Sequence, residues 1–596
     1  MNGIYLVIIA ALWLTIAYRL YGAFIAAKVL ALDPNRTTPA VRLNDGRDYV
    51  PTNKWVTFGH HFAAIAGAGP LVGPVLAAQF GYLPGTLWIL IGAVVAGAVH
   101  DMVILFASVR HDGLSVAEIA KKEVSNVSGF CASIAVLFLL VITMAGMAVV
   151  VANALFNSPW GTFTVAVTIP IAIFIGIYLR WLRPGKIQEA SILGVVLVLA
   201  GVFVGPWVQH SWLAPYFTFN LTQLSIMLTV YGFFAAALPV WLLLAPRDYL
   251  STYMKIGTIA ALTLGIIIVR PDIHMPAMSQ FINGGGPIIG GPVWPYVFIT
   301  IACGALSGFH SLISTGTTPK MIMNEKEILP IGYGAMLVEA FVSLMALIAA
   351  TSLQPADYFA INAPAAVFAK LGMNVVDLPM LSEMVGENVA ARPGGAVSLA
   401  VGMAHIFSNI PGMKALMSFW YHFCIMFEAL FILTIIDAGT RVGRYLLQEM
   451  GGVVYAPLKN THWWPGILLT SALISGAWGY LVLQGSISTI WPLFGVCNQL
   501  LGTLTLAVGT TMLFRMGKGR YAWITIAPMS FLAITTIAAA YLNIVNTYLP
   551  ANNYLLAGVS VLMLVLVVVV IADSIRRWLE LSGSTPQAAK PSLNEQ

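Results

Sequence analysis

Charged residues are scarce in this chain: Asp, Glu, Lys and Arg make up 9% of its 596 residues, against 59% hydrophobic residues. Soluble proteins carry about 25% charged residues, and a soluble chain of this length would need polar surface over roughly four domains. The missing charge therefore excludes the soluble, disordered and fibrous classes. A mean hydropathy of +0.86 indicates a membrane protein instead.

Disulfide and metal-ligand spacings are also missing. The chain has four cysteines, each in a separate apolar segment and none in a CxxC or Cys/His pattern: Cys131, Cys303, Cys424 and Cys497. We expect packing thiols, with neither a disulfide framework nor a structural zinc site, and no metal or cofactor. The N-terminus lacks a basic leader and a small-residue cleavage site, which predicts that it is retained as a first span.

Long apolar runs dominate what is present. They predict an all-α polytopic membrane protein with about 15 transmembrane helices, in a range of roughly 14–17. The runs lie near 4–27, 56–80, 85–109, 128–155, 162–179, 187–206, 224–244, 254–269, 293–312, 331–352, 415–437, 464–484, 487–513, 521–548 and 554–573.

Basic residues recur in alternate connections between these runs. The net charge of +6 therefore indicates positive-inside topology, with the N-terminus outside and the C-terminus inside, and not nucleic-acid binding. The basic connections are 28–54, 110–122, 180–186, 247–255, 320–326, 441–459, 515–520 and 576–577.

The same charges divide the chain into regions. Residues 1–575 are predicted to form one transporter domain, with an acidic external loop at 353–393, a cytoplasmic loop at 438–463 and a short cytoplasmic tail at 576–596. The outer loop and Arg441 must be separated by an odd number of crossings, yet two apolar runs lie between them. We therefore expect 394–411 to be re-entrant or half-spanning.

Two apolar segments carry helix-breaking residues at membrane depth. The first reads GHHFAAIAGAGPLVGP over 59–74, and the second reads GFHSLISTGTTPK over 308–320. Both contain the pattern G-x-H-x5-G-x2-P. Backbone N–H and C=O groups that lack helical partners are tolerated within a membrane only where they line a cavity or are buried in protein. In the expected topology the segments run in opposite directions, which is the inverted-repeat signature of secondary transporters.

These breaks predict a substrate site. Half-helix N-termini suit a carboxylate and half-helix C-termini suit a cation. No arginine lies at the centre of an apolar run, so we expect the breaks to hold the carboxylate, with Gly67–Pro70 and Gly316–Pro319 unwound beside a shared cavity. The alternative is that Gly and Pro permit close helix packing. The predicted substrate-binding residues are His61, Gly67, Gly69, His310, Ser314, Thr315 and Thr317.

Four carboxyl groups at membrane depth are the candidates for proton coupling. A charge there costs about 2.5–3.5 kcal/mol on insertion scales, so each such group is expected to have a partner or a function. Glu428 and Glu339 have no local basic partner and rank first. Asp101 follows His100, but adjacent helical side chains diverge, so we expect no dyad between them. Asp437 has Arg441 at i+4 and is expected to form a structural ion pair. A protonated carboxyl bonded to a neighbouring helix is the alternative for each glutamate.

Five longer blocks resemble the carbon starvation protein A (CstA) family: residues 59–85, 96–113, 304–322, 427–449 and 491–501. The resemblance covers nearly the whole chain. It implies a multi-pass importer of peptides or pyruvate in the bacterial inner membrane, used under carbon starvation and driven by protons or by sodium. It also implies broken helices in a LeuT/APC-like inverted repeat. This chain begins at what resembles the family's second N-terminal hydrophobic segment.

Other functional classes remain open from the residues alone. A haem- or metal-binding membrane oxidoreductase would need histidine pairs across helices, and a nutrient sensor would need an output domain. A channel would not accumulate its substrate. We expect a transporter and not an enzyme, with a small-molecule substrate, a coupling ion and the lipid bilayer as its partners.

Overall fold

The computed structural model describes residues 1–46, 48–183, 186–239, 242–460 and 463–583. These residues form helices joined by loops, and their extended pairing is limited to the isolated bridges Asn2–Asp272, Thr37–Asn324 and Thr52–Ile322. The prediction of an all-α membrane protein is confirmed.

Within the described residues, eleven helical segments are long and apolar enough to cross a membrane, or twelve if one bent pair counts as a span. The predicted count of about 15 is not confirmed. The eleven are Ile4–Val29 (α1 and its π-helical extension), Tyr82–Arg110 (α5 and α6), α8 (Asn126–Leu155), Pro159–Leu182 (α9 and its extension), α10 (Ile187–Gln209), Glu325–Thr351 (ending in α15), α20 (Met417–Gly451), α21 (Trp464–Gln484), α22 (Ile487–Arg515), α23 (Trp523–Asn543) and α24 (Tyr554–Gly583).

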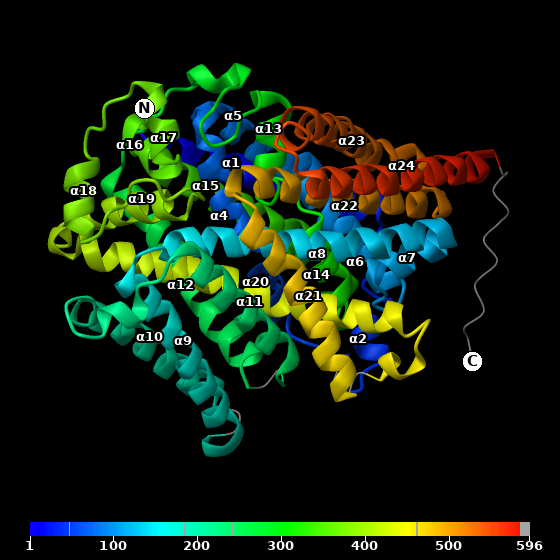
Figure 1. Ribbon diagram of the computed structural model, residues 1–596. Coiled ribbons are helices and arrows are strands. Elements are labelled where there is room, and N and C mark those ends of the chain that lie inside the picture. Colours follow the sequence, from blue (N-terminus) through cyan, green and yellow to red (C-terminus); the bar gives the residue numbers. More distant parts are fainter. Residues whose placement is uncertain (47, 184–185, 240–241, 461–462, 584–596) are drawn as a thin grey trace.

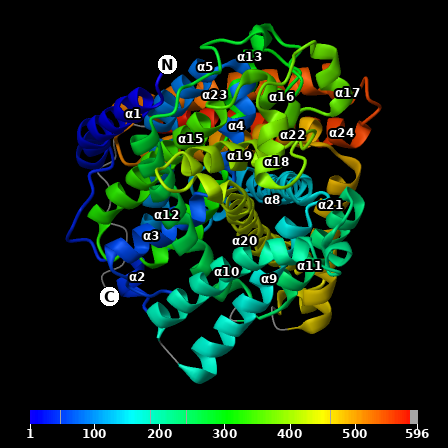
Figure 2. The same ribbon diagram turned by 90° about the vertical axis from the view of Figure 1, so that its left-hand side faces the viewer.

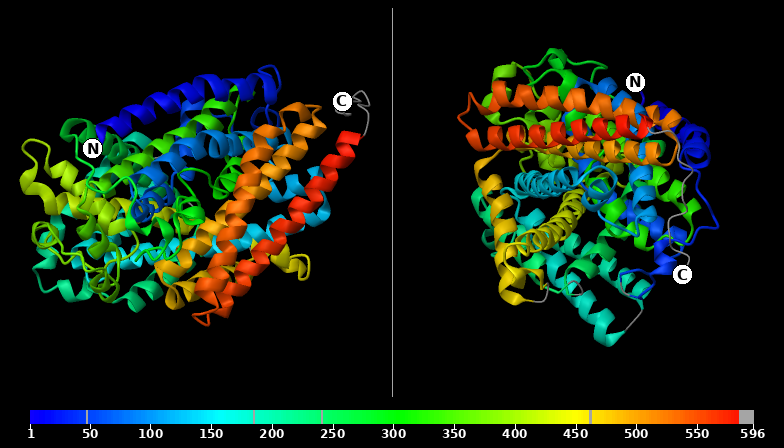
Figure 3. Two further views of the ribbon diagram at one scale, coloured as in Figure 1. Left: turned by 90° about the horizontal axis from the view of Figure 1, so that it is seen from above. Right: turned by 90° about the vertical axis from the view of Figure 1, so that its right-hand side faces the viewer.

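The long helices form layers. α22, α23 and α24 lie together on one side of the molecule, and α9 and α10 lie on the opposite side in every view (Figures 1, 2 and 3). Local signals set the helix starts. At α9, Pro159 occupies the first turn and the Ser158 hydroxyl accepts a hydrogen bond from the Gly161 N–H at 3.2 Å, which satisfies a donor that the helix cannot.

Contacts between loops define two rims. On one rim, Arg110 Nη2 lies 2.9 Å from Glu325 Oε2, and Lys518 Nζ donates to the Lys28 carbonyl at 3.4 Å. These bonds join four of the basic connections in two pairs, as the charge pattern predicts. On the opposite rim, the Gly3 N–H donates to the Pro271 carbonyl at 2.8 Å, so the N-terminus lies away from the basic loops.

The helix at 394–411 is short. α19 (Ala396–Ser408) has 13 residues, or about 20 Å of helix, against roughly 30 Å of hydrocarbon core. It ends beside the start of α20, where Ser408 Oγ lies 3.4 Å from Met417 Sδ. Ser418 in turn bonds the Val385 carbonyl of the 353–393 loop. This geometry fits a segment that enters and leaves at one rim.

Two helices are broken near their middle. α3 (Lys54–Ile65) and α4 (Gly69–Ala77) meet at a 45° bend, so Gly67 lies in the break while Gly69 and Pro70 begin α4. α13 (Val293–Thr300) and α14 (Phe309–Gly316) are separated by residues 301–308. The prediction of unwinding at Gly316–Pro319 is wrong, because α14 continues to Gly316 and a 3-10 turn follows.

Three further boundaries differ from those expected. Arg247 and Lys255 do not lie in a cytoplasmic connection; both are inside α12 (Leu244–Val269) and buried, with 0% and 1% exposure. α20 continues to Gly451, so only the last part of 438–463 is a loop. α24 reaches Gly583, so 576–583 is helix and not tail, while 584–596 lie outside the described residues. The charges of α12 and α20 are buried against neighbouring helices, whereas Arg576 and Arg577 of α24 pair with Asp573 and Glu580 of the same helix.

Candidate functional site

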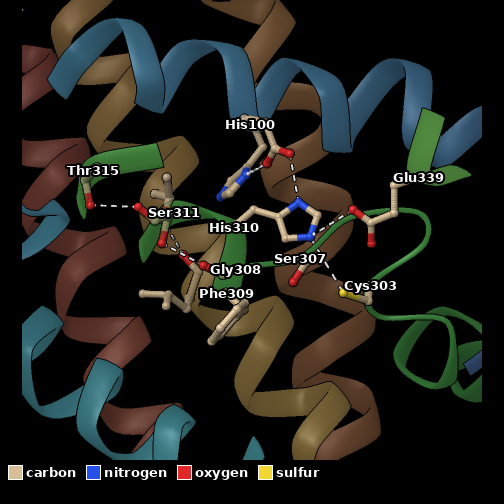
Figure 4. Close-up of polar contacts among 12 residues, drawn as sticks. His100, Cys303, Ser307, Gly308, Phe309, His310, Ser311, Thr315 and Glu339 are labelled. Carbon is tan, nitrogen blue, oxygen red and sulfur yellow. Dashed lines mark hydrogen bonds and ion pairs between the residues drawn. The ribbon is translucent and has the colours of Figure 1, made fainter. Parts of the chain in front are cut away.

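His310 is the centre of a buried polar cluster at the break between α13 and α14. Its Nδ1 atom lies 2.8 Å from Asp101 Oδ2 on α6 (Ala98–Arg110), and its Nε2 atom lies 3.2 Å from Glu339 Oε2 on α15 (Ala335–Thr351). All three side chains are fully buried. Figure 4 shows the imidazole between the α6 side and the Glu339 carboxyl. One imidazole therefore joins three helices through two carboxylates.

The cluster extends to two more side chains. His100 Nδ1 lies 2.7 Å from Asp101 Oδ1, so the expectation that these neighbours form no dyad is wrong: both side chains bend toward each other in the protein interior. Cys303 Sγ lies 3.6 Å from His310 Nε2. The cysteine is buried, as expected, but it is part of this polar cluster and not of an apolar packing layer.

Cys303, His310 and Glu339 are a group that could hold a metal ion, since one ligand atom from each lies within 4.8 Å of the others. No ligand spacing in the sequence predicts this group, because Glu339 comes from another helix. His310 already contacts two carboxyl groups, Asp101 at 2.8 Å and Glu339 at 3.2 Å, and three protein ligands leave a structural zinc site incomplete. We therefore interpret the cluster as an ionic network.

The unwound segment before α14 is held by Asn498 of α22. The Asn498 amide oxygen accepts from the Phe309 N–H at 2.9 Å, and its amide nitrogen donates to the Ala302 carbonyl at 3.0 Å. Backbone groups that lost their helical partners are thereby satisfied inside the membrane. Asn498 belongs to the WPLFGVCNQLL block, and the sequence reasoning did not select it. The signal for it was the pair of adjacent amides, Asn498 and Gln499, in a largely apolar span.

His61 lies on the α3 side of the same region. It is fully buried, its Nδ1 lies 2.8 Å from the Thr318 hydroxyl, and it is within electrostatic range of Asp101 and His310. Its Nε2 has no hydrogen-bond partner among the described residues. The two predicted histidines are thus brought together.

The predicted glycines let the first break approach its neighbours. A Cβ on Gly69 would lie 2.5 Å from Cys303 Cβ, and a Cβ on Gly67 would lie 2.1 Å from Ile435 Cδ1. Because real Cβ contacts are longer, α4 can reach Cys303 only through a glycine. The first break therefore packs directly against the second. The sequence left close helix packing and a site at the breaks as alternatives for these glycines, and the structure is consistent with both at once.

The three predicted hydroxyls have different environments. The Ser314 hydroxyl is buried and lacks a hydrogen-bond partner in the described part of the chain. The Thr315 hydroxyl donates to the Ser311 carbonyl at 2.7 Å and accepts from the Val116 N–H at 3.2 Å. Thr317 is exposed and lies 3.2 Å from His60 Nε2. Ser314 is the better placed for a substrate, since the Thr315 hydroxyl is committed to backbone.

The other two carboxyl candidates lie outside the cluster. Glu428 is 2% exposed, and both of its oxygens lack hydrogen-bond partners among the residues described. Asp437 Oδ2 lies 3.6 Å from Arg247 Nη1 of α12. The expected ion pair with Arg441 is wrong, because the Arg441 guanidinium instead donates to the Ala235 carbonyl at 2.5 Å.

Two loop groups show how charges outside the spans are satisfied. Glu387 accepts from Arg392 Nη1 at 2.8 Å and from the Tyr421 hydroxyl at 2.7 Å. Burial opposes ionisation of Glu387, but the neighbouring His422 imidazole, 3.8 Å away, and the charge of Arg392 outweigh it and lower the Glu387 pKa to about 2. His111, on the basic rim, is partly desolvated, yet its hydrogen bonds to Glu123 and the Ala107 carbonyl raise its pKa.

Comparisons with known proteins match the whole chain. A family model described as carbon starvation protein CstA matches residues 2–539. A peptide transporter CstA of Bacillus subtilis is 53% identical over 586 residues, 98% of both chains. A peptide transporter CstA of Escherichia coli is 48% identical, covering 96% of this chain and 90% of the relative. A pyruvate/proton symporter, BtsT of Escherichia coli, is 44% identical, covering 98% and 93%.

A solved structure, a manganese transporter mutant of Eremococcus coleocola, aligns with 90% of this chain and 99% of its own at 12% identity. Its TM-score is 0.42, too low to establish a shared fold.

Proposed function

The chain belongs to the carbon starvation protein CstA family, and on that premise we propose that it is a proton-coupled importer of peptides or pyruvate. Its eleven or more apolar spans and its bacterial relatives make it a multi-pass protein of the bacterial inner membrane. The observation that carries the proposal is the Asp101–His310–Glu339 network, which joins α6, α14 and α15 beside the break in α3–α4.

Protonation can change how these helices are held. An imidazole donates from both ring nitrogens only when it is protonated. Protonated His310 can therefore bond Asp101 and Glu339 at once, whereas neutral His310 can donate to only one of them. Loss of the proton releases α14 from one neighbouring helix. A short helix beside two breaks is the kind of element that alternates between states in transporters of this class.

Glu339 is the preferred proton carrier among the four carboxyl candidates, because it shares His310 with Asp101. Glu428 is the second candidate, since its partnerless carboxyl must be neutral or bind an ion to remain in an apolar span. Asp437 is held by Arg247 and ranks last. Sodium remains the alternative coupling ion.

The topology behind this proposal has about 15 crossings, as the apolar runs indicate. The twelve spans, with α3–α4 counted once, leave three further candidates: α11 (Leu221–Ala237), α12 and the α13–α14 pair. We also propose that α3–α4 and α13–α14 are corresponding elements of a LeuT/APC-like inverted repeat, since both are broken and they meet at Gly69 and Cys303.

A membrane oxidoreductase and a nutrient sensor are less well supported, because the relatives carry transporter names. Uptake by the purified protein in liposomes tests the proposal. Labelled pyruvate and a labelled dipeptide are supplied under an imposed pH gradient or an imposed sodium gradient. Accumulation of either substrate with the pH gradient alone is expected. No accumulation of either under both gradients would contradict an importer.

A further inference from the structure

An apolar groove runs along the outside of the protein between α1, α3 and the span that ends in α15. Its volume is about 420 Å³. One wall is a face of α1 over residues 11–18, and the other is a face of the second span over residues 330–341. Ile4–Val29 is the least buried of the eleven spans, and Figures 2 and 3 show α1 along the edge of the protein. The groove therefore faces lipid.

The length of the groove matches one leaflet of a bilayer. Along residues 330–341 the second wall rises about 16 Å, which is half of the roughly 30 Å hydrocarbon core. The lining is apolar except for the hydroxyls of Thr15 and Tyr18 and the indole N–H of Trp55. The groove therefore fits an acyl chain of a lipid from a single leaflet.

Trp55 marks the end of the groove at the basic rim. It is the second residue of α3 and is 70% exposed. The isolated bridge between Thr52 and Ile322 joins this end to the basic connection 320–326. Tryptophan is enriched at the level of the lipid head groups, and the positive-inside rule makes the basic side cytoplasmic. The groove therefore opens into the inner leaflet.

Two cations lie at this end of the groove. Lys54 Nζ is 5.2 Å from the centre of the Trp55 ring, and Lys326 directly precedes the part of its span that lines the groove. Both lysines are exposed, and neither forms an ion pair with a residue that the structure describes. The nearest carboxylates along the chain are occupied. Glu325 accepts from Arg110 Nη2 at 2.9 Å, and Glu327 accepts from a backbone N–H.

A second apolar groove shows that this charge is particular to the first. It lies between α8, α21, α22 and α24, with a volume of about 490 Å³. Its lining includes Ala477 near the end of α21 and Leu555 at the start of α24. The neighbouring loop residues 485–486 and 549–553 contain no basic residue. The two grooves are alike in size and apolar character but differ in the charge at their ends.

We propose that the groove between α1, α3 and α15 binds an anionic phospholipid of the inner leaflet. One acyl chain lies between α1 and the α15 span, and the phosphate lies beside Lys54 and Lys326. Basic residues next to spans on the cytoplasmic side recognise anionic head groups in this way. Val338 lines the groove one residue before Glu339, so a bound lipid contacts the helix that carries a carboxyl group of the His310 network.

Lipid binding to the purified full chain in detergent tests the site. The probes are dioleoyl phosphatidylglycerol, dioleoyl phosphatidylcholine and free glycerol 3-phosphate. Native mass spectrometry counts the lipids retained, and the melting temperature reports binding independently. Phosphatidylglycerol is expected to bind roughly 25-fold more tightly than phosphatidylcholine, about fivefold for each lysine. Glycerol 3-phosphate, which has no acyl chain, is expected to leave the melting temperature unchanged.

Variants locate the lipid. Lys54→Gln and Lys326→Gln should each weaken phosphatidylglycerol binding about fivefold and leave phosphatidylcholine binding unchanged. Lys122→Gln, an exposed lysine of the basic connection 110–122, is their control and should bind as the parent does. Ala11→Phe should fill the groove and abolish the tight phosphatidylglycerol site. Its matched control is Ala477→Phe, an exposed alanine that lines the second groove, which should retain that site.

Four results would overturn the proposal. Equal binding of the two phospholipids by the parent would make the groove a general lipid surface. Parent-like phosphatidylglycerol binding by Ala11→Phe would place the lipid elsewhere. An equal rise in melting temperature with glycerol 3-phosphate would indicate a site for soluble phosphates. A parent dimer that Ala11→Phe dissociates would show that a second copy of the chain occupies the groove.

Discussion

The Nδ1 atom of His310 lies 2.8 Å from Oδ2 of Asp101, although the two residues are 209 positions apart in the sequence. This contact fixes the orientation of the imidazole ring, so that its Nε2 atom points at Glu339. His310 therefore contacts two buried carboxyl groups from two other helices, and a proton can be shared among the three side chains. The predictions below follow from this arrangement and from the helices that support it.

Glu339→Gln should uncouple transport. The amide mimics the protonated carboxyl and cannot release a proton, so accumulation in response to a pH gradient should disappear while exchange at equal concentrations persists. Glu428→Gln, an equally buried substitution outside the network, tests the second candidate in parallel and should keep gradient-driven accumulation. Liposome uptake and counterflow measure both activities. Gradient-driven accumulation by Glu339→Gln together with its loss in Glu428→Gln would assign the proton to Glu428.

Asp101→Asn should destabilise the protein. Removing one partner from a buried ion pair costs about 3–5 kcal/mol, because the other partner remains buried without compensation. Adding His310→Gln should recover part of that loss, since the double variant contains no unpaired imidazolium. Thermal unfolding in detergent measures the effect. Glu580→Gln, on the exposed part of α24, should change stability by less than about 1 kcal/mol; equal effects at 101 and 580 would contradict a paired network.

Gly69→Ala should impair both stability and uptake. The new Cβ would overlap Cys303 Cβ, and such overpacking costs about 1–3 kcal/mol. Gly59→Ala, on α3, is the control, because nothing lies within 4 Å of a Cβ there. Melting temperature and initial uptake rate are the measurements. Parent-like behaviour of Gly69→Ala would mean that the two breaks do not meet closely.

Glu387 should make the external loop sensitive to acid. Its folded pKa of about 2 lies below the ordinary value of 4.5. A lowered folded pKa contributes stability that is fully present above the unfolded pKa and is lost as the pH falls through the folded pKa. The contribution is roughly 3 kcal/mol. Glu387→Gln should therefore flatten the decrease in melting temperature between neutral pH and about pH 3. An unchanged pH profile would show that Glu387 is not held by Arg392.

Cysteines introduced at Lys370 and Lys459 should be labelled from opposite sides of the membrane. The acidic loop and the basic loop that follows α20 are separated by one full crossing if α19 does not span. A membrane-impermeant thiol reagent applied to intact cells and to inverted vesicles measures the sidedness, and the parent protein, whose four cysteines are buried, provides the background. Labelling of both positions from one side would contradict the half-spanning α19.

Some of these features were available from the sequence alone. The scarcity of charge and the length of the apolar runs determined an all-α membrane protein, because lipid excludes unpaired charge and unpaired backbone. Glycine and proline at 66–74 determined the break in α3–α4, and the five sequence blocks determined the family. Asp101 and Glu339 were selected because ionisable groups at membrane depth are costly, and His61 and His310 because they lie in the two broken segments that share a motif.

Only the tertiary structure decided how these residues combine. No periodicity relates Asp101, Cys303, His310 and Glu339, which meet because α6, α14 and α15 converge on one break. Charge alone placed Arg247 and Lys255 in a connection, but Asp437, the Ala63 carbonyl and aromatic rings surround them inside α12. Arg441 and Arg444 are likewise buried within α20, and Arg576 and Arg577 pair with carboxylates of α24 itself, so both helices continue beyond the expected ends. A helix in a membrane protein is solvated by its neighbours as much as by lipid, and the identity of those neighbours is set by the fold.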